Sequence, residues 1–117
     1  MSLMDYQKSQ RDRNLDLLKG IIFKTMSDIS VNVYLFGSWA RKEEKRTSDI
    51  DIALQSKEEI PAVKWIELRE RIEESTLPYK VDLVDLSKAA PVFKEKVERE
   101  GILWRDYSNG SSSQTKH

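Results

Sequence analysis

The chain has 117 residues, which fits one domain. Its 20 Lys and Arg balance its 20 Asp and Glu, so the formal net charge is zero and no direct binding to nucleic acid by bulk attraction is expected. Cysteine is absent and the one histidine is His117, the last residue, which excludes disulfides, thiolate nucleophiles, cysteine zinc sites and a Ser–His–Asp triad. Chemistry is therefore left to carboxylates, hydroxyls, Lys, Arg and backbone amides.

Apolar runs in this sequence are too short to cross a membrane. The longest strongly apolar run is Val33–Phe36, whereas a membrane-spanning helix needs about 20 such residues. The N-terminus has no apolar stretch typical of a signal peptide, so a cytoplasmic protein is expected. Residues 108–117 are polar and rich in serine, which predicts a disordered tail after one domain over residues 1–107.

Helical and strand-like spacings alternate along the domain. Leu15, Leu18 and Ile22 fall on one stripe, which predicts an N-terminal helix. The predicted elements in chain order are a helix over about 5–26, a strand over 31–36, a helical turn over 39–41, a strand over 49–54, a helix over 61–75, a strand over 79–85, a helix over 87–101 and a short edge strand over 102–104.

The two later helices have recognisable starts. Pro61 suits a first helical turn, and Val63, Ile66 and Ile72 mark much of the buried stripe that we expect after it. Ser87 is expected to cap the final helix. Helices packed against a small mixed β-sheet make an α/β (α+β) domain.

The strands carry the acidic residues. Residues 31–36 are apolar on both faces, which predicts a covered strand. Residues 49–54 alternate between acid and aliphatic, so Asp49 and Asp51 leave the same face, roughly 6.6 Å apart at the backbone. Asp82 lies on the following strand. Asp85 points to the opposite face from Asp82 and is expected to serve the strand end.

Three features of the sequence suit phosphoryl transfer. A glycine such as Gly37 lets the backbone approach a phosphate, and Ser38 adds a hydroxyl at the start of a helical turn. Asp49 and Asp51 could converge on one or two Mg²⁺ ions, and Asp82 could ligate a metal or accept the proton of an attacking hydroxyl. Each feature alone is more often a turn or a solvated carboxylate; together, in this order, they indicate a site.

These residues resemble a known signature. Gly37-Ser38-Trp39-Ala40-Arg41, followed after seven residues by Asp49-Ile50-Asp51, resembles that of the DNA polymerase β-like nucleotidyltransferase superfamily, in which ten residues separate a Gly-Ser pair from Asp-x-Asp. Leu77–Asp85 resembles the strand that bears the third carboxylate. With the chain length, the match points to the minimal nucleotidyltransferases (MNT), over roughly residues 5–107.

The resemblance implies a palm-like nucleotidyltransferase fold and an activity. Family members transfer a nucleoside monophosphate, here AMP from ATP, to a hydroxyl with Mg²⁺, two ions being expected, and release pyrophosphate. The site residues that it implies are Asp49, Asp51 and Asp82 as catalytic metal ligands, and Gly37, Ser38 and Arg41 as nucleotide contacts. Arg41 could bind phosphate or brace the turn. The sequence departs from the family at Trp39, where Arg is frequent, and at Lys42, where Gly is frequent.

The resemblance also implies a partner. Many minimal members are antitoxins that adenylylate a tyrosine of a HEPN-domain toxin. Association of this chain with copies of itself, as a homo-oligomer, is a second expectation. Two alternatives stay open: a binding module that neutralises its partner by contact, and a subunit of a small-molecule nucleotidyltransferase of the aminoglycoside type. The latter enzymes have a second domain, which this chain is too short to build.

Overall fold

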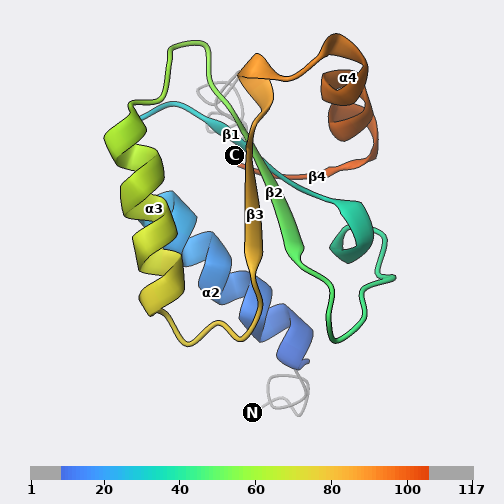
Figure 1. Cartoon of the computed structure of the whole chain (residues 1–117). Coiled ribbons are helices and arrows are strands. Elements are labelled where there is room, and N and C mark those ends of the chain that lie inside the picture. Colours follow the sequence, from blue (N-terminus) through green and yellow to red (C-terminus); the bar gives the residue numbers. More distant parts are fainter. Residues whose placement is uncertain (1–8, 106–117) are drawn as a thin grey trace, which may run out of the picture.

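The computed structural model describes residues 9–105 and contains the predicted order of elements within them. The tail over 108–117 and the first residues of the predicted N-terminal helix lie outside the described residues. The elements are α2 (Gln10–Thr25), β1 (Asn32–Phe36), the 3-10 turn η1 (Gly37–Trp39), β2 (Ile50–Gln55), α3 (Ala62–Glu74), β3 (Val81–Asp85), the 3-10 turn η2 (Leu86–Lys88), α4 (Pro91–Glu100) and β4 (Ile102–Arg105) (Figure 1). No helix within residues 9–105 is long and apolar enough to cross a membrane.

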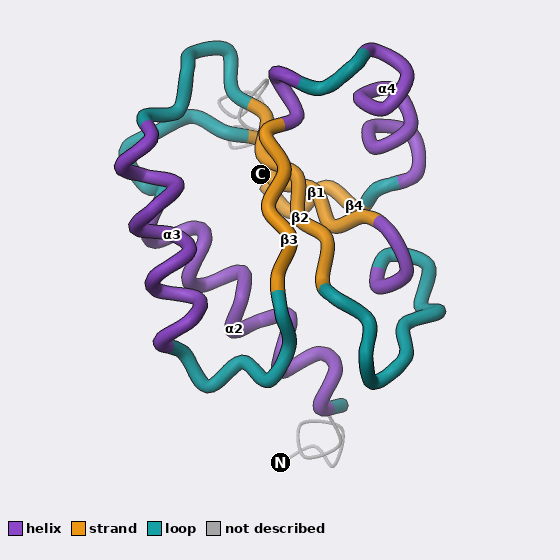
Figure 2. Tube along the Cα trace, in the orientation of Figure 1, coloured by secondary structure: helices purple, strands orange, loops and turns teal. Residues whose placement is uncertain are grey.

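The four strands form one mixed sheet in the order β3-β2-β1-β4. Strand β1 is antiparallel to both β2 and β4, whereas β2 and β3 are parallel. Helix α3 makes the crossover that a parallel pair requires. The sheet seen edge-on separates α2 and α3 on one side from α4 on the other (Figure 2). The predicted α/β class with a small mixed sheet is therefore confirmed.

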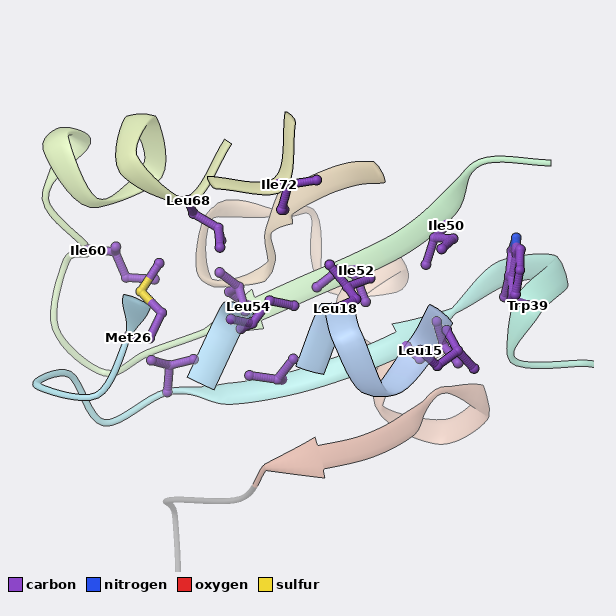
Figure 3. Close-up of a cluster of buried hydrophobic side chains, with 14 residues drawn as sticks. Leu15, Leu18, Met26, Trp39, Ile50, Ile52, Leu54, Ile60, Leu68 and Ile72 are labelled. Atoms are coloured by element: carbon purple, nitrogen blue, oxygen red, sulfur yellow. The ribbon is translucent and has the colours of Figure 1, made fainter. Parts of the chain in front are cut away.

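The two faces of the sheet are buried to different extents. The face toward α2 and α3 carries the main core, in which Leu18, Ile52 and Leu54 are fully buried (Figure 3). The opposite face has a smaller buried cluster, which consists of Tyr34, Ala53, Leu86 and Val97. Helix α4 covers this second face only in part, which leaves one end of it for a site.

The predicted buried stripe of α3 is partly wrong. Val63 and Ile66 are 66% and 54% exposed, whereas Leu68 and Ile72 are buried. Residues four apart lie on one helical face, and the pair at 68 and 72 is the one turned to the core. The stripe facing the core is decided by how α3 meets α2 and the sheet, which aliphatic spacing alone does not specify.

The predicted start of the last helix is also wrong. Helix α4 begins at Pro91, and Ser87 lies in η2 instead of capping it. A residue before proline avoids helical backbone angles, and Ala90 is extended accordingly (φ −62°, ψ 147°), so the helix cannot continue backward through it. The Ser87 hydroxyl bonds across the fold, accepting from the Ser56 amide (3.0 Å) and donating to the Ser56 carbonyl (2.8 Å).

Candidate active site

The site begins at Gly37, where the chain leaves β1 for the turn η1. Gly37 has a φ of +74°, a conformation that glycine adopts without strain. Phe36 pairs with Asp51 in the sheet, so the turn starts directly beside that carboxylate. A Cβ added at position 37 would lie 3.2 Å from Asp51 Cγ and closer still to Oδ2. The Gly37 backbone therefore packs against Asp51 at a distance that no other residue allows.

The structure brings the three predicted carboxylates to one end of the sheet. Asp51 is the second residue of β2, and Asp82 pairs with it in the parallel register of β3. Asp49 lies one residue before β2, so the predicted strand starts one residue early. Asp51 shares its sheet face with Ala53 of the smaller cluster, because side chains two apart on a strand point the same way.

Burial and the neighbouring negative charges change the pKa of Asp51. Its pKa is raised, first by burial and then by the charges of Asp82 and Asp49, while Arg41 acts in the opposite direction. Asp51 and Asp49 are half-buried and Asp82 is exposed. A carboxylate whose pKa is raised by burial and by neighbouring negative charges lies in an environment that a cation stabilises.

These carboxylates fit a hard cation that arrives with its substrate. Within residues 9–105, no group of three or more His, Cys, Asp or Glu side chains is arranged to hold a metal ion by itself. Mg²⁺ takes only one or two protein carboxylates and completes its shell with water and substrate phosphates. The all-oxygen set of Asp49 and Asp51 matches that behaviour.

The turn η1 offers donors beside the carboxylates. Ser38 is half-buried in it, and the first amides of such a turn have no carbonyl partner within it. Arg41 follows the turn, is exposed, and its Nε donates to Glu43 Oε1 at 2.9 Å. Gly37, Ser38 and Arg41 thus lie at the same end of the sheet as the acids.

The two departures from the signature have separate explanations. Trp39 is 1% exposed and packs edge-to-face on Tyr79, with ring centroids 4.9 Å apart, so it is a core residue. Figure 3 shows it at the same end of the core as Leu15. Lys42 has a φ of +59°, in the left-handed region that favours glycine. The glycine frequent in the family at this place therefore has a backbone reason, and Lys42 adopts the same angle with strain.

A bracing network that the sequence analysis missed holds the loop between the turn and the acids. Trp39 Nε1 donates to the Ser48 carbonyl (3.4 Å), one residue before Asp49. Arg11 of α2 pairs with Glu44 through Nε (2.9 Å) and donates through Nη2 to the Trp39 carbonyl. Arg11 and Glu44 are 33 residues apart, so no local pattern could have identified the pair.

Helix α4 contributes a second feature that the sequence analysis did not anticipate. A hollow of about 170 Å³ lies between η1 and α4, with Gly37 and Arg41 on one side and Phe93 and Lys96 on the other. The spacing of residues 93, 96, 97 and 100 places them on one helical face. The sequence shows that spacing, but it does not show which element of the fold this face of α4 contacts.

Comparisons with known proteins identify relatives of this chain. Residues 21–108 match the family model described as polymerase beta, nucleotidyltransferase. A Haemophilus influenzae protein described as a probable protein adenylyltransferase, MntA, is 30% identical over 93 residues, which cover 80% of each chain. The Shewanella oneidensis protein adenylyltransferase MntA is 38% identical over 73 residues, which are 62% of this chain and 52% of that protein.

A solved structure resembles this chain in fold as well as in sequence. A crystal structure of a toxin–antitoxin with AMP-PNP contains a chain that is 31% identical, with a TM-score of 0.61, over 80% of this chain and 77% of that chain. The match to the family model spans most of this chain, from α2 to beyond β4, and includes the turn and all three acids. The chain therefore belongs to the polymerase beta nucleotidyltransferase family.

Proposed function

We propose that this chain is an antitoxin that transfers AMP from ATP to a tyrosine hydroxyl of a HEPN-type toxin and releases pyrophosphate. The observation that carries the proposal is the contact of the Gly37 turn with Asp51, at the point where Asp49 and Asp82 converge. The similarity to proteins described as protein adenylyltransferases, and to a chain of a toxin–antitoxin with AMP-PNP, supports the choice of donor and acceptor.

Each side chain has a separate task in this reaction. Gly37 and Ser38 hold the triphosphate through backbone amides and the serine hydroxyl, and Arg41 adds a positive charge beside it. Asp49 and Asp51 would hold one or two Mg²⁺ ions, which neutralise the charge that develops on the phosphates. These assignments follow from residue chemistry and from the positions in the signature.

The acceptor hydroxyl approaches from the side of Asp82. Its oxygen forms a bond to the α-phosphorus while the bond from that phosphorus to the bridging oxygen of pyrophosphate breaks. The hydroxyl proton goes to Asp82 or to solvent. In the second case, the role of Asp82 is that of a metal ligand. Asp82 is exposed on β3, which is an edge strand, so the reacting hydroxyl can come from a large partner.

An open site favours a protein acceptor over a small alcohol. Among residues 9–105, no second domain stands over Asp82 to enclose a small substrate. A protein brings its own surface and needs no such wall. The expected result is clear labelling of a HEPN-type protein and little modification of free small alcohols.

The proposal is tested with labelled ATP, Mg²⁺ and a purified HEPN-type protein. We expect AMP on the partner with the parent chain, and a loss of transfer of at least about a hundredfold with Asp49→Asn or Asp82→Asn. Asp85→Asn is the matched control. Its carboxylate lies on the same strand as Asp82 but accepts a hydrogen bond from the Ser87 amide (3.2 Å), as expected for a strand end.

Two results would contradict the proposal. One is full transfer by Asp82→Asn together with full transfer by Asp49→Asn. The other is a partner complex that stays neutralised in the presence of Mg²⁺ and ATP while no AMP is found on the partner. That second result would establish the binding module instead. The cytoplasmic location and a homo-oligomer stay predictions.

A further inference from the structure

The hollow between η1 and α4 is continuous with the proposed nucleotide site. Gly37 and Arg41 line it, and the same two residues flank the proposed triphosphate position. Its volume is about 170 Å³. A ligand held at Gly37 therefore has an adjacent space into which a further part of it can extend.

The walls of this hollow are largely aromatic and aliphatic. Phe36 and Phe93 meet edge-to-face with ring centroids 5.6 Å apart, and Val97 is buried behind them. Phe93 nevertheless remains 36% exposed. An exposed ring beside a cavity is a surface on which a flat, apolar group can stack.

The hollow also carries positive charge that an anionic part of a ligand can contact. Arg41 stands on the η1 side, where Glu43 pairs with it at 2.9 Å, and Lys96 stands on the α4 side. Lys96 makes no ion pair with any residue that the structure describes, so its charge is available to a ligand. Glu100 also lines the hollow but pairs with Arg99, whose Nη2 lies 3.4 Å from its Oε2.

We propose that this hollow is the nucleoside subsite, in which the base of the nucleoside triphosphate packs against Phe93 while its phosphates lie at Gly37. The inference rests on the proposed function, since it places the second half of the same substrate. It assigns α4 a role in substrate binding that the signature does not contain. It also implies that binding energy for the base comes from stacking, which every base can supply.

The test compares two probes that share phosphates but differ in the base. Binding of Mg²⁺–ATP and of Mg²⁺–tripolyphosphate to the full chain is measured by calorimetry. Phe93→Ala should weaken ATP binding about tenfold and leave tripolyphosphate binding unchanged. Val92→Ala is the matched control, because Val92 is the adjacent residue, is 80% exposed, and does not line the hollow.

A second variant separates stacking from folding. Phe93→Leu keeps apolar bulk but removes the aromatic face, so it should also weaken ATP selectively while its unfolding midpoint stays close to that of the parent. Unchanged ATP affinity in both Phe93 variants overturns the subsite. Equal weakening of both probes in Phe93→Leu overturns it as well, because the phosphates alone would then be affected.

Failure of the subsite and failure of the proposed function give different results. If the parent chain transfers AMP but both Phe93 variants bind ATP as the parent does, the subsite alone is wrong. If the parent chain binds neither probe and transfers no AMP, the proposed function is wrong and the subsite with it.

Discussion

Replacing Gly37 by alanine tests the closest contact of the site. The added Cβ would lie 3.2 Å from Asp51 Cγ, and the residue would keep a φ of +74°. The carboxylate is the far end of a half-buried side chain and can rotate away. We therefore expect Gly37→Ala to fold with a displaced Asp51.

The cost has two parts that can be estimated separately. A non-glycine residue at positive φ costs about 1–2 kcal/mol, from which about 0.4–1 kcal/mol is recovered because alanine restricts the unfolded chain. Forcing Asp51 off its preferred rotamer adds about 0.5–1.5 kcal/mol. The total of about 2 kcal/mol is small beside the roughly 5–15 kcal/mol of a typical domain. The effect on turnover is larger, because a shift of about 1 Å in a reacting group can cost about a hundredfold.

Urea unfolding and labelled AMP transfer measure the two effects. In an Asp51→Ala background the carboxylate is absent, so the cost of Gly37→Ala should fall from about 2 to about 1 kcal/mol. An equal cost in both backgrounds would show that the Cβ does not meet Asp51. Parent-level transfer by the single variant Gly37→Ala would refute the need for close approach.

Three further changes have expected outcomes. The pKa of Asp51 is raised above 3.8 by burial and by the charges of Asp82 and Asp49, so its ionised form destabilises the fold. Asp51→Asn should therefore raise the free energy of unfolding at pH 7 in the absence of Mg²⁺ and nucleotide. This gain in stability should shrink as the pH falls toward 3.8, because the folded parent protein then binds the proton. Urea titrations across this range measure it, and a gain that is independent of pH would contradict the cause. Lys42→Gly should stabilise the protein by about 0.5–1 kcal/mol in thermal unfolding, because relief of positive φ outweighs the added chain entropy; a loss of stability would refute the strain. Trp39→Phe removes the hydrogen bond to the carbonyl before Asp49 and should lower kcat about tenfold with little change in KM, whereas an unchanged kcat would mean that this bond positions nothing.

Local patterns were sufficient for the order of the elements and for recognition of the family. The 49–54 segment alternates with period two, so its strand and the shared face of Asp49 and Asp51 follow from the residues alone. The ten residues between Ser38 and Asp49 and the acid at Asp82 were enough to recognise the family, and the match over residues 21–108 agrees. Period and spacing are local properties, and a sequence displays them directly.

Only the tertiary structure decided what each face meets. Val63 and Ile66 have apolar side chains like Leu68 and Ile72, but the docking angle of α3 leaves the first pair in solvent. Ser87 has the chemistry of a cap, but the backbone angles imposed before a proline start the helix four residues later.

The same holds for contacts between distant parts of the site. Asp82 reaches Asp51 through the parallel register of β3 on β2, and Phe93 reaches the Gly37 turn through the position of α4 on the second face of the sheet. These pairs are separated by 31 and 56 residues. Sheet register and helix docking are set by the packing of the whole core, so no segment read by itself contains them.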